Sequence, residues 1–316
     1  MLLYFFGFAF ISPIALVAAP LALCLLFHRP GLRETAVAVL LLTLVAWSVT
    51  SAGDDFARFE AAWVLLLAGG TAVALTWGAP ERGELVQAGL VTVGLAALAG
   101  VFLVQVTAFS WAQLAWIAER HYGGYVRGVL DMLAARASLT GTPDLALIEA
   151  LRTTADAMVR AIGVLLPGLI LIQSVAALAA TWALYRMIAR DPVGDRLPAL
   201  REFRFNDSLV WGIVLALLAL VLPGLGALRL GSELAHYLRL VGGNLATFFG
   251  GLYIARGLAV ASGLAAAGGI GGPLVTVLSV IATVFFLPLV AFTALALGVS
   301  DTWIDWRKLA QRAQRR

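Results

Sequence analysis

Four polar side chains interrupt long apolar stretches of the sequence: Arg256, Asn244, Gln173 and Gln105. Polar and ionisable groups inside membrane spans are costly, so they are candidates for a functional site. Arg256 and Asn244 share one apolar segment, which makes them candidates to bind a solute in a cavity among the spans. The alternative for Arg256 is a guanidinium that reaches back to the nearer membrane interface. For the three amides, the alternative is hydrogen bonding between helices.

Three glycines recur every seven residues in the segment that holds Arg256: Gly243, Gly250 and Gly257. Seven residues make almost two helical turns, so these glycines share one helix face. Small residues allow helix backbones to approach closely in lipid. We therefore expect this face to pack tightly against a neighbouring helix, with Arg256 and Asn244 on a different side.

Acidic, aromatic and basic residues directly follow the last apolar segment, at Asp301, Trp303, Asp305, Trp306 and Arg307. Trp favours the headgroup level of a membrane, and each basic side chain near anionic lipid contributes about 1 kcal/mol. We therefore expect an interfacial anchor that continues the last span as a helix. Docking of a protein partner is the alternative. Because aspartate is a poor lipid contact, we expect Asp301 and Asp305 to turn inward and pair with arginine.

Catalytic and metal-binding patterns do not stand out in the sequence. The three histidines, His28, His121 and His236, lack the spacing of metal ligands. We find no Gly-x-Ser-x-Gly elbow, His-Glu-x-x-His pair or phosphate-binding loop. We therefore expect a protein that is not an enzyme and that uses neither a metal nor a cofactor.

Composition indicates an integral membrane protein. Of 316 residues, 61% are hydrophobic and 13% are charged, and the mean hydropathy is +0.94. Soluble chains are about 45–50% apolar and about 25% charged. Backbone polar groups must be satisfied internally in lipid, so the apolar segments are expected to be helices. We predict an all-α polytopic transmembrane bundle of about eight spans, over 2–27, 33–53, 59–78, 85–109, 162–188, 208–228, 235–264 and 273–299.

A polar insert separates the predicted spans into two groups of four. We predict a first four-span half, an amphipathic helical insert, a second four-span half and a basic interfacial tail, over 1–109, 110–161, 162–299 and 300–316. Apolar residues recur at helical spacing on both sides of a break at 138–143, which predicts a helical hairpin. The hairpin either lies on the headgroups, with Trp111, Tyr122 and Tyr125 at the interface, or docks a partner.

Basic residues mark the cytoplasmic side of a membrane protein. With eight spans and the insert left out, each side carries eight basic residues, so the rule decides little. Counting the insert favours weakly a cytoplasmic location for both termini. Eight spans place the five arginines of 186–204 opposite the tail, whereas a ninth crossing between Leu234 and Val299 would put both clusters on one side. The net charge of +4 suits contact with anionic lipid headgroups. The basic residues are scattered among loops, so they give no indication of nucleic-acid binding.

Two stretches resemble a known family. LPALREFRFNDSLVWGIVLALL (Leu197 to Leu218) has a proline, a short aromatic and basic segment, and a Trp that opens a span. LGVSDTWIDWRK (Leu297 to Lys308) ends the last span with an Asp, an aromatic residue and a basic pair. Both resemble the YybS-like family of uncharacterised bacterial multi-pass membrane proteins. That family is remotely similar to substrate-binding membrane subunits of vitamin importers and to a cell-shape membrane protein. The resemblance covers nearly the whole chain and carries no functional residues onto it.

Two functions are therefore expected. The first is a small-molecule binding or transport-related subunit of the bacterial cytoplasmic (inner) membrane. Such a subunit needs an energising protein partner, because we find no nucleotide site in the chain. The alternative is a non-enzymatic scaffold that recruits envelope or cytoplasmic proteins through the insert and the tail. In both cases the lipid bilayer is the immediate surrounding.

Overall fold

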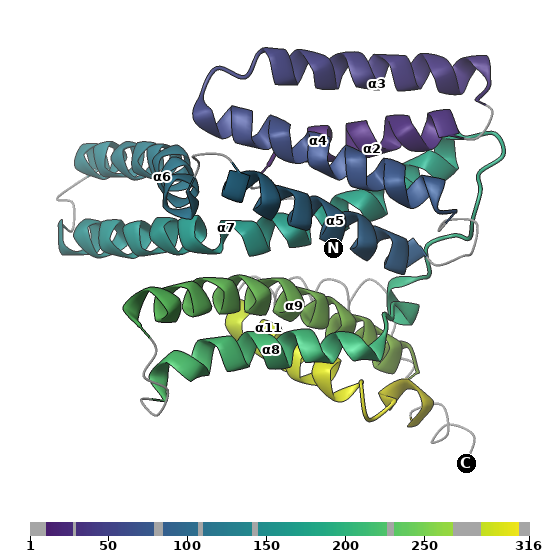
Figure 1. Cartoon of the computed structure of the whole chain (residues 1–316). Helices are drawn as coiled ribbons and strands as arrows, with labels where there is room; N and C mark the ends of the chain where they lie inside the picture. Colours follow the sequence, from purple (N-terminus) through teal and green to yellow (C-terminus); the bar gives the residue numbers. More distant parts are fainter. Residues whose placement is uncertain are drawn as a thin grey trace. The chain divides into compact units, whose positions relative to one another are not determined.

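The computed structural model describes residues 11–27, 30–78, 85–106, 110–140, 145–225, 231–267 and 286–309. The secondary structure of these residues is helical (Figure 1). The all-helical class expected from composition is therefore confirmed. The chain divides into two compact units, Met1–Gly194 and Asp195–Arg316. The predicted division into four parts rests on composition, whereas these two units rest on contacts within the fold. The four-part division therefore stays a prediction.

Unit 1 contains six described helices: α2 (Pro13–Phe27), α3 (Leu32–Thr50), α4 (Asp55–Thr76), α5 (Leu85–Val106), α6 (Trp111–Thr140) and α7 (Leu145–Ile188). α2 contacts α3, α4 and α7, and α4 packs on α5. Asp54 caps α4, because its carboxylate accepts a hydrogen bond from the Ala57 N–H at 2.7 Å. Leu16, Leu67 and Ile170 are fully buried, so the core of the unit lies among α2, α4 and α7.

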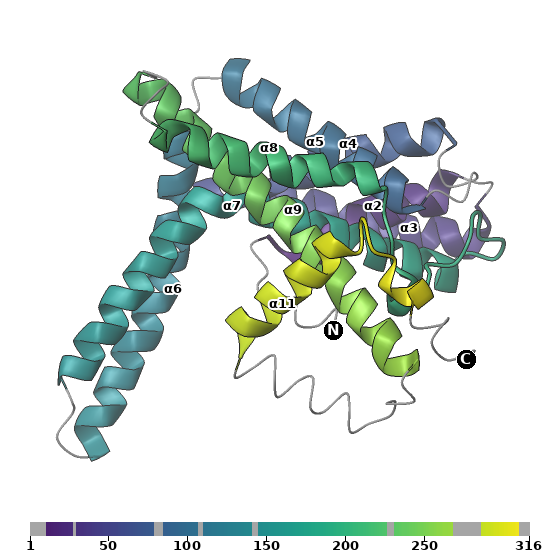
Figure 2. The same cartoon turned by 90° about the horizontal axis from the view of Figure 1, so that it is seen from below.

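The helix α7 is longer than a membrane span requires. It has 44 residues, whereas about 20 are enough to cross a bilayer core. The second helix of the predicted insert therefore runs directly into the next apolar segment as one helix. α6 lies against α7. In Figure 2, α6 and the first part of α7 project from the other helices of this unit.

Unit 2 contains three described α-helices: α8 (Val210–Val221), α9 (Ser232–Ala267) and α11 (Leu287–Ser300). Short 3₁₀ turns at Leu200–Glu202 and Asp207–Leu209 precede α8, and one at Leu222–Gly224 follows it. α9 contacts both α8 and α11, and Figure 2 shows α11 crossing α9. A Cβ on Gly257 would overlap the carbonyl of Ala294, and one on Gly298 would overlap the carbonyl of Tyr253. The two backbones therefore touch at this crossing.

Six described helical segments are long and apolar enough to cross a membrane: Leu32–Thr50, Asp55–Thr76, Val86–Val106, Ala146–Ile188, Asp207–Gly224 and Ser232–Ala266. The apolar helices Pro13–Phe27 and Leu287–Ser300 are shorter. A multi-pass membrane architecture follows, and the predicted count of eight is not confirmed. The predicted spans 2–27 and 273–299 lie partly outside the described residues, which is why the structure gives shorter helices there.

Candidate functional site

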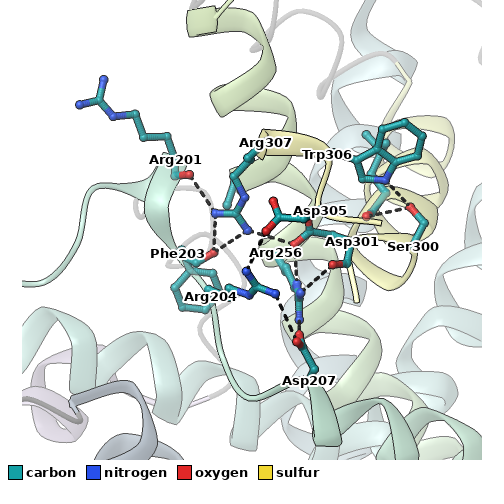
Figure 3. A network of polar contacts seen from close by, with 12 residues as sticks. Arg201, Phe203, Arg204, Asp207, Arg256, Ser300, Asp301, Asp305, Trp306 and Arg307 are labelled. Carbon is teal, nitrogen blue, oxygen red and sulfur yellow. Dashed lines mark hydrogen bonds and ion pairs between the residues drawn. The ribbon is translucent and has the colours of Figure 1, made fainter. Parts of the chain in front are cut away.

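A buried arginine in unit 2 joins three parts of the chain (Figure 3). Arg256 comes from α9 and Asp301 from the turn after α11, and both are almost completely buried. The Arg256 Nε donates to Asp301 Oδ2 at 2.9 Å, and its Nη2 donates to the Asp301 carbonyl at 3.1 Å. Asp207, just before α8, places Oδ1 2.8 Å from Arg256 Nη1. Those two atoms form an ion pair without hydrogen-bond geometry.

Aromatic rings shield this arginine. The Arg256 Cζ lies 5.3 Å from the ring centroid of Phe205 and 6.0 Å from that of Tyr253. The two rings meet edge to face at 5.1 Å. Such cation–π contacts stabilise a desolvated guanidinium. Excluding water also strengthens the attraction between Arg256 and its two carboxylates.

A second layer of contacts surrounds the buried pair. Arg307 Nη2 donates to Asp301 Oδ2 at 3.1 Å, and its Nη1 donates to the carbonyls of Arg201 at 3.0 Å and Phe203 at 3.3 Å. Arg204 donates to Asp305 Oδ2 and to Asp207 Oδ2, both at 3.2 Å. The tail is therefore attached to the segment that precedes α8.

The charges of this cluster balance. It contains three arginines and three aspartates: Arg204, Arg256, Arg307, Asp207, Asp301 and Asp305. Buried charges are tolerated when they are paired and hydrogen-bonded, and loss of one partner leaves an uncompensated charge. We call these six residues the charge cluster. The expectation that the two tail aspartates pair with arginine is confirmed.

The outer aspartate of the charge cluster stays ionised at neutral pH. Burial acts to raise the pKa of Asp305. Hydrogen bonds from Lys308, with the positive charges of Lys308 and Arg204, outweigh burial and lower that pKa below its ordinary value. For Arg204, burial acts to lower the pKa, but Asp207 and Asp305 raise it above its ordinary value. Both groups therefore carry charge over the physiological range.

Arg256 lies level with the ends of two other apolar segments of unit 2. One partner, Asp207, opens the candidate span Asp207–Gly224, and the other, Asp301, follows the apolar helix α11. α9 continues past this level to Ala267, where Gly263 lies close to the side chain of Arg307. The guanidinium is fully buried and does not reach out to headgroup water. This arrangement avoids the cost of an unpaired charge in the hydrocarbon core.

The tail does not continue α11 as a helix, so that prediction is wrong. A turn at 301–304 separates α11 from one further helical turn at 306–309. The reason is that Asp301 points back to Arg256 with both its carboxylate and its carbonyl. Trp306 donates to Ser300 Oγ at 2.9 Å, whereas Trp303 is exposed.

The other predicted polar residues lie apart from the charge cluster. Asn244 donates to the Leu240 carbonyl of its own helix at 2.9 Å. It is twelve residues from Arg256, or about 18 Å along a helix. Gln105 lies exposed on α5. The glycine face is not continuous, since a Cβ on Gly250 would have nothing within 4 Å, while Gly257 meets α11.

Gln173 binds the backbone just before α2 in unit 1. Its Oε1 accepts from the Ile11 N–H at 3.0 Å, and its Nε2 donates to the Ile11 carbonyl at 2.6 Å. The next N–H, of Ser12, donates to the carboxylate of Glu60 on α4. Side chains thus satisfy the backbone groups that precede α2, as a low-dielectric surrounding requires.

Three of these functional candidates were missed in the sequence. Asp207 and Arg204 lie in the quoted stretch before the sixth predicted span, and Glu60 lies just inside the third. Glu60 could have been found from the sequence, because it is a charged residue inside an apolar segment. Among the described residues, no group of three or more His, Cys, Asp or Glu side chains is placed to hold a metal ion.

The helices and the interfacial charge cluster define a multi-pass α-helical membrane protein. The chain belongs to the DUF2232 family of predicted membrane proteins, whose profile matches residues 1–302. No curated protein and no solved structure matches it.

Proposed function

We propose that the protein is a non-enzymatic scaffold of the bacterial cytoplasmic membrane that binds a protein partner through the α6–α7 hairpin. The hairpin is α6 together with residues 145–161 of α7. The observation that carries this proposal is a row of exposed apolar side chains on a segment that no membrane span requires. The partner is a protein with a complementary apolar patch, from the envelope or the cytoplasm.

The apolar row follows one face of α6. Tyr125, Val129, Met132 and Leu133 recur at helical spacing, and each is more than half exposed. Charged groups flank the row, including Asp131, whose Oδ1 lies 3.1 Å from Arg152 Nη2 on α7. Protein interfaces combine apolar and aromatic anchors with a polar rim. An exposed apolar patch of this kind is a typical mark of an interaction site.

The contacts of Arg256 also favour a scaffold over a solute-binding subunit. A solute-binding guanidinium needs donors directed into a cavity. Two nitrogens of Arg256 instead donate to Asp301, and the third pairs with Asp207. Its geometry supports a role in holding the tail and the segment before α8 in place.

Photocrosslinking tests the scaffold. A photoreactive amino acid replaces Met132 on the hairpin or, as a matched control, Phe102 on α5, which is similarly exposed and apolar. We expect a protein adduct of one discrete mass at position 132 in native membranes, and only lipid adducts at position 102. Lipid adducts alone at both positions would mean that the hairpin lies on the headgroups, and the scaffold would be rejected.

A transport-related, small-molecule binding subunit is the second candidate. It is supported by the polar groups that Gln173 and Glu60 direct at the backbone of Ile11 and Ser12, just before α2. Polar side chains placed among apolar spans are candidates for a substrate site. The resemblance to the YybS-like family, and through it to vitamin importers, points the same way. A solute that stabilises the wild type against heat but not Glu60→Gln would favour this candidate.

A further inference from the structure

Two basic segments of unit 2 that are far apart in sequence lie on the same side of the membrane. Arg307 binds the carbonyls of Arg201 and Phe203, and Arg204 pairs with Asp305 at 3.2 Å. Groups in hydrogen-bond contact cannot be separated by a hydrocarbon core of about 30 Å. Residues 197–207 and the start of the tail must therefore share one side.

This contact constrains the number of crossings. From Asp207 the chain runs through the candidate spans α8 and α9 and returns to the same level, where Arg256 lies 2.8 Å from Asp207. From Arg256 it returns again to Asp301, at 2.9 Å. Each return needs an even number of crossings. A single span over 273–299 is therefore excluded, and the alternative of a ninth crossing between Leu234 and Val299 satisfies the contacts.

The basic residues then show a strong bias to one side. That side holds thirteen of them: Arg29, Arg33, Arg82, Arg186, Arg190, Arg196, Arg201, Arg204, Arg307, Lys308, Arg312, Arg315 and Arg316. Outside the α6–α7 hairpin, the opposite side holds Arg58, Arg229 and Arg239. With the hairpin left out, the count of eight basic residues on each side thus becomes thirteen on one side and three on the other. Short loops with this excess of Arg and Lys lie in the cytoplasm.

We propose that residues 196–204 and residues 307–309 of the tail form one composite basic surface on the cytoplasmic side, which binds the headgroups of anionic phospholipids. Arg201 and Lys308 expose more than half of their side chains. Their own ion pairs, to Glu202 and Asp305, are of the exposed kind that contributes little. Headgroup phosphates can therefore replace these partners. Trp303, in the same tail as Lys308, is exposed, as expected of a tryptophan at the headgroup level.

The charge cluster explains why the surface is built from two segments. Asp301 is buried beneath Arg307, so its charge is neutralised inside the protein and does not repel lipid. The charge cluster holds the segment with Arg201 and the tail with Lys308 close to the start of α8 and the end of α11. Each basic side chain near an anionic surface contributes about 1 kcal/mol, or roughly a fivefold preference.

Cysteine labelling tests the shared side. In a Cys24→Ser background, single cysteines replace Leu200, Gln314 or, as a control at the start of α9, Ser232. A membrane-impermeant thiol reagent is applied to intact cells. We expect Ser232→Cys to react at once, and the other two only after permeabilisation. Labelling of Leu200→Cys and Gln314→Cys on opposite sides would overturn the shared surface, and labelling of both from outside would overturn its cytoplasmic placement.

Lipid selectivity tests the headgroup site. The protein is placed in phosphatidylcholine nanodiscs with a minority of spin-labelled phosphatidylglycerol or spin-labelled phosphatidylcholine. We expect more immobilised phosphatidylglycerol at low salt. Arg201→Gln with Lys308→Gln should reduce this preference by about fivefold for each charge removed, while Arg58→Gln with Arg239→Gln, exposed residues of the other side, should not. Equal losses in the two pairs, or no preference at low salt, would overturn the proposal.

Discussion

At the scale of the residue, pairing explains how Arg256 is tolerated inside an apolar helix. An isolated charge there is costly, but Asp301 and Asp207 supply two carboxylates and Phe205 supplies a ring face. Neither carboxylate comes from the same helix. Because of this, local patterns in the sequence could identify Arg256 as unusual but could not name its partners.

Removing the buried guanidinium should destabilise unit 2 strongly. We expect Arg256→Ala to lower the free energy of unfolding by about 3–5 kcal/mol, because the buried Asp301 keeps its contact with Arg307 but loses its fully buried partner, and Asp207 loses a partner as well. The matched control is Arg239→Ala, on an exposed position of the same helix. Thermal unfolding in detergent measures both. Equal effects of the two substitutions would show that the buried pair contributes nothing special.

The tail contact should depend on acid pH. The pKa of Asp305 is lowered in the folded protein, so its contribution is present above the ordinary carboxyl pKa and is lost as pH falls through the lowered value. We expect the stability difference between wild type and Asp305→Asn to hold at neutral pH, to shrink below the ordinary carboxyl pKa and to vanish once the pH is below the lowered pKa of Asp305. Unfolding at a series of pH values measures this. A difference that grows as the pH falls would contradict it.

At the scale of the element, hydropathy predicted the helices well and their ends poorly. The apolar segments all contain helix where the structure describes them. The helix α7 runs on past residue 161 because residues 145–188 contain no glycine pair or capping sequence that stops a helix, and Pro167 lies inside α7. Heptad spacing suggested a glycine face, yet only contacts with α11 distinguish Gly257 from Gly250.

These two glycines should respond differently to the same substitution. Gly257→Ala places a methyl group against the Ala294 carbonyl, so we expect a loss of about 1–3 kcal/mol from overpacking. Gly250→Ala meets nothing within 4 Å and removes a poor helix former, so we expect no loss. Unfolding of the two variants side by side measures the difference. Equal destabilisation would mean that α9 and α11 do not touch at this crossing.

At the scale of the whole molecule, contacts add to what the charge count left open. The sequence had eight basic residues on either side, because the eighth predicted span separated the tail from residues 186–204. The bonds of Arg307 and Arg204 bring residues 201–204 and the tail together. Distant pairing of this kind is set by the three-dimensional fold and has no local signature in the sequence.

Crosslinking in native membranes tests the attachment of the tail most directly. In a Cys24→Ser background, Arg204→Cys with Asp305→Cys forms the test pair, and Arg239→Cys with Asp305→Cys forms the control pair. A short bifunctional thiol reagent should link the test pair within one chain and leave the control pair unlinked. Adding Arg256→Ala should lower the yield of this crosslink, because Asp301 then loses its contact with Arg256 and the tail is held less firmly. Failure to link positions 204 and 305, or equal linking of both pairs, would contradict a tail held beside the segment before α8.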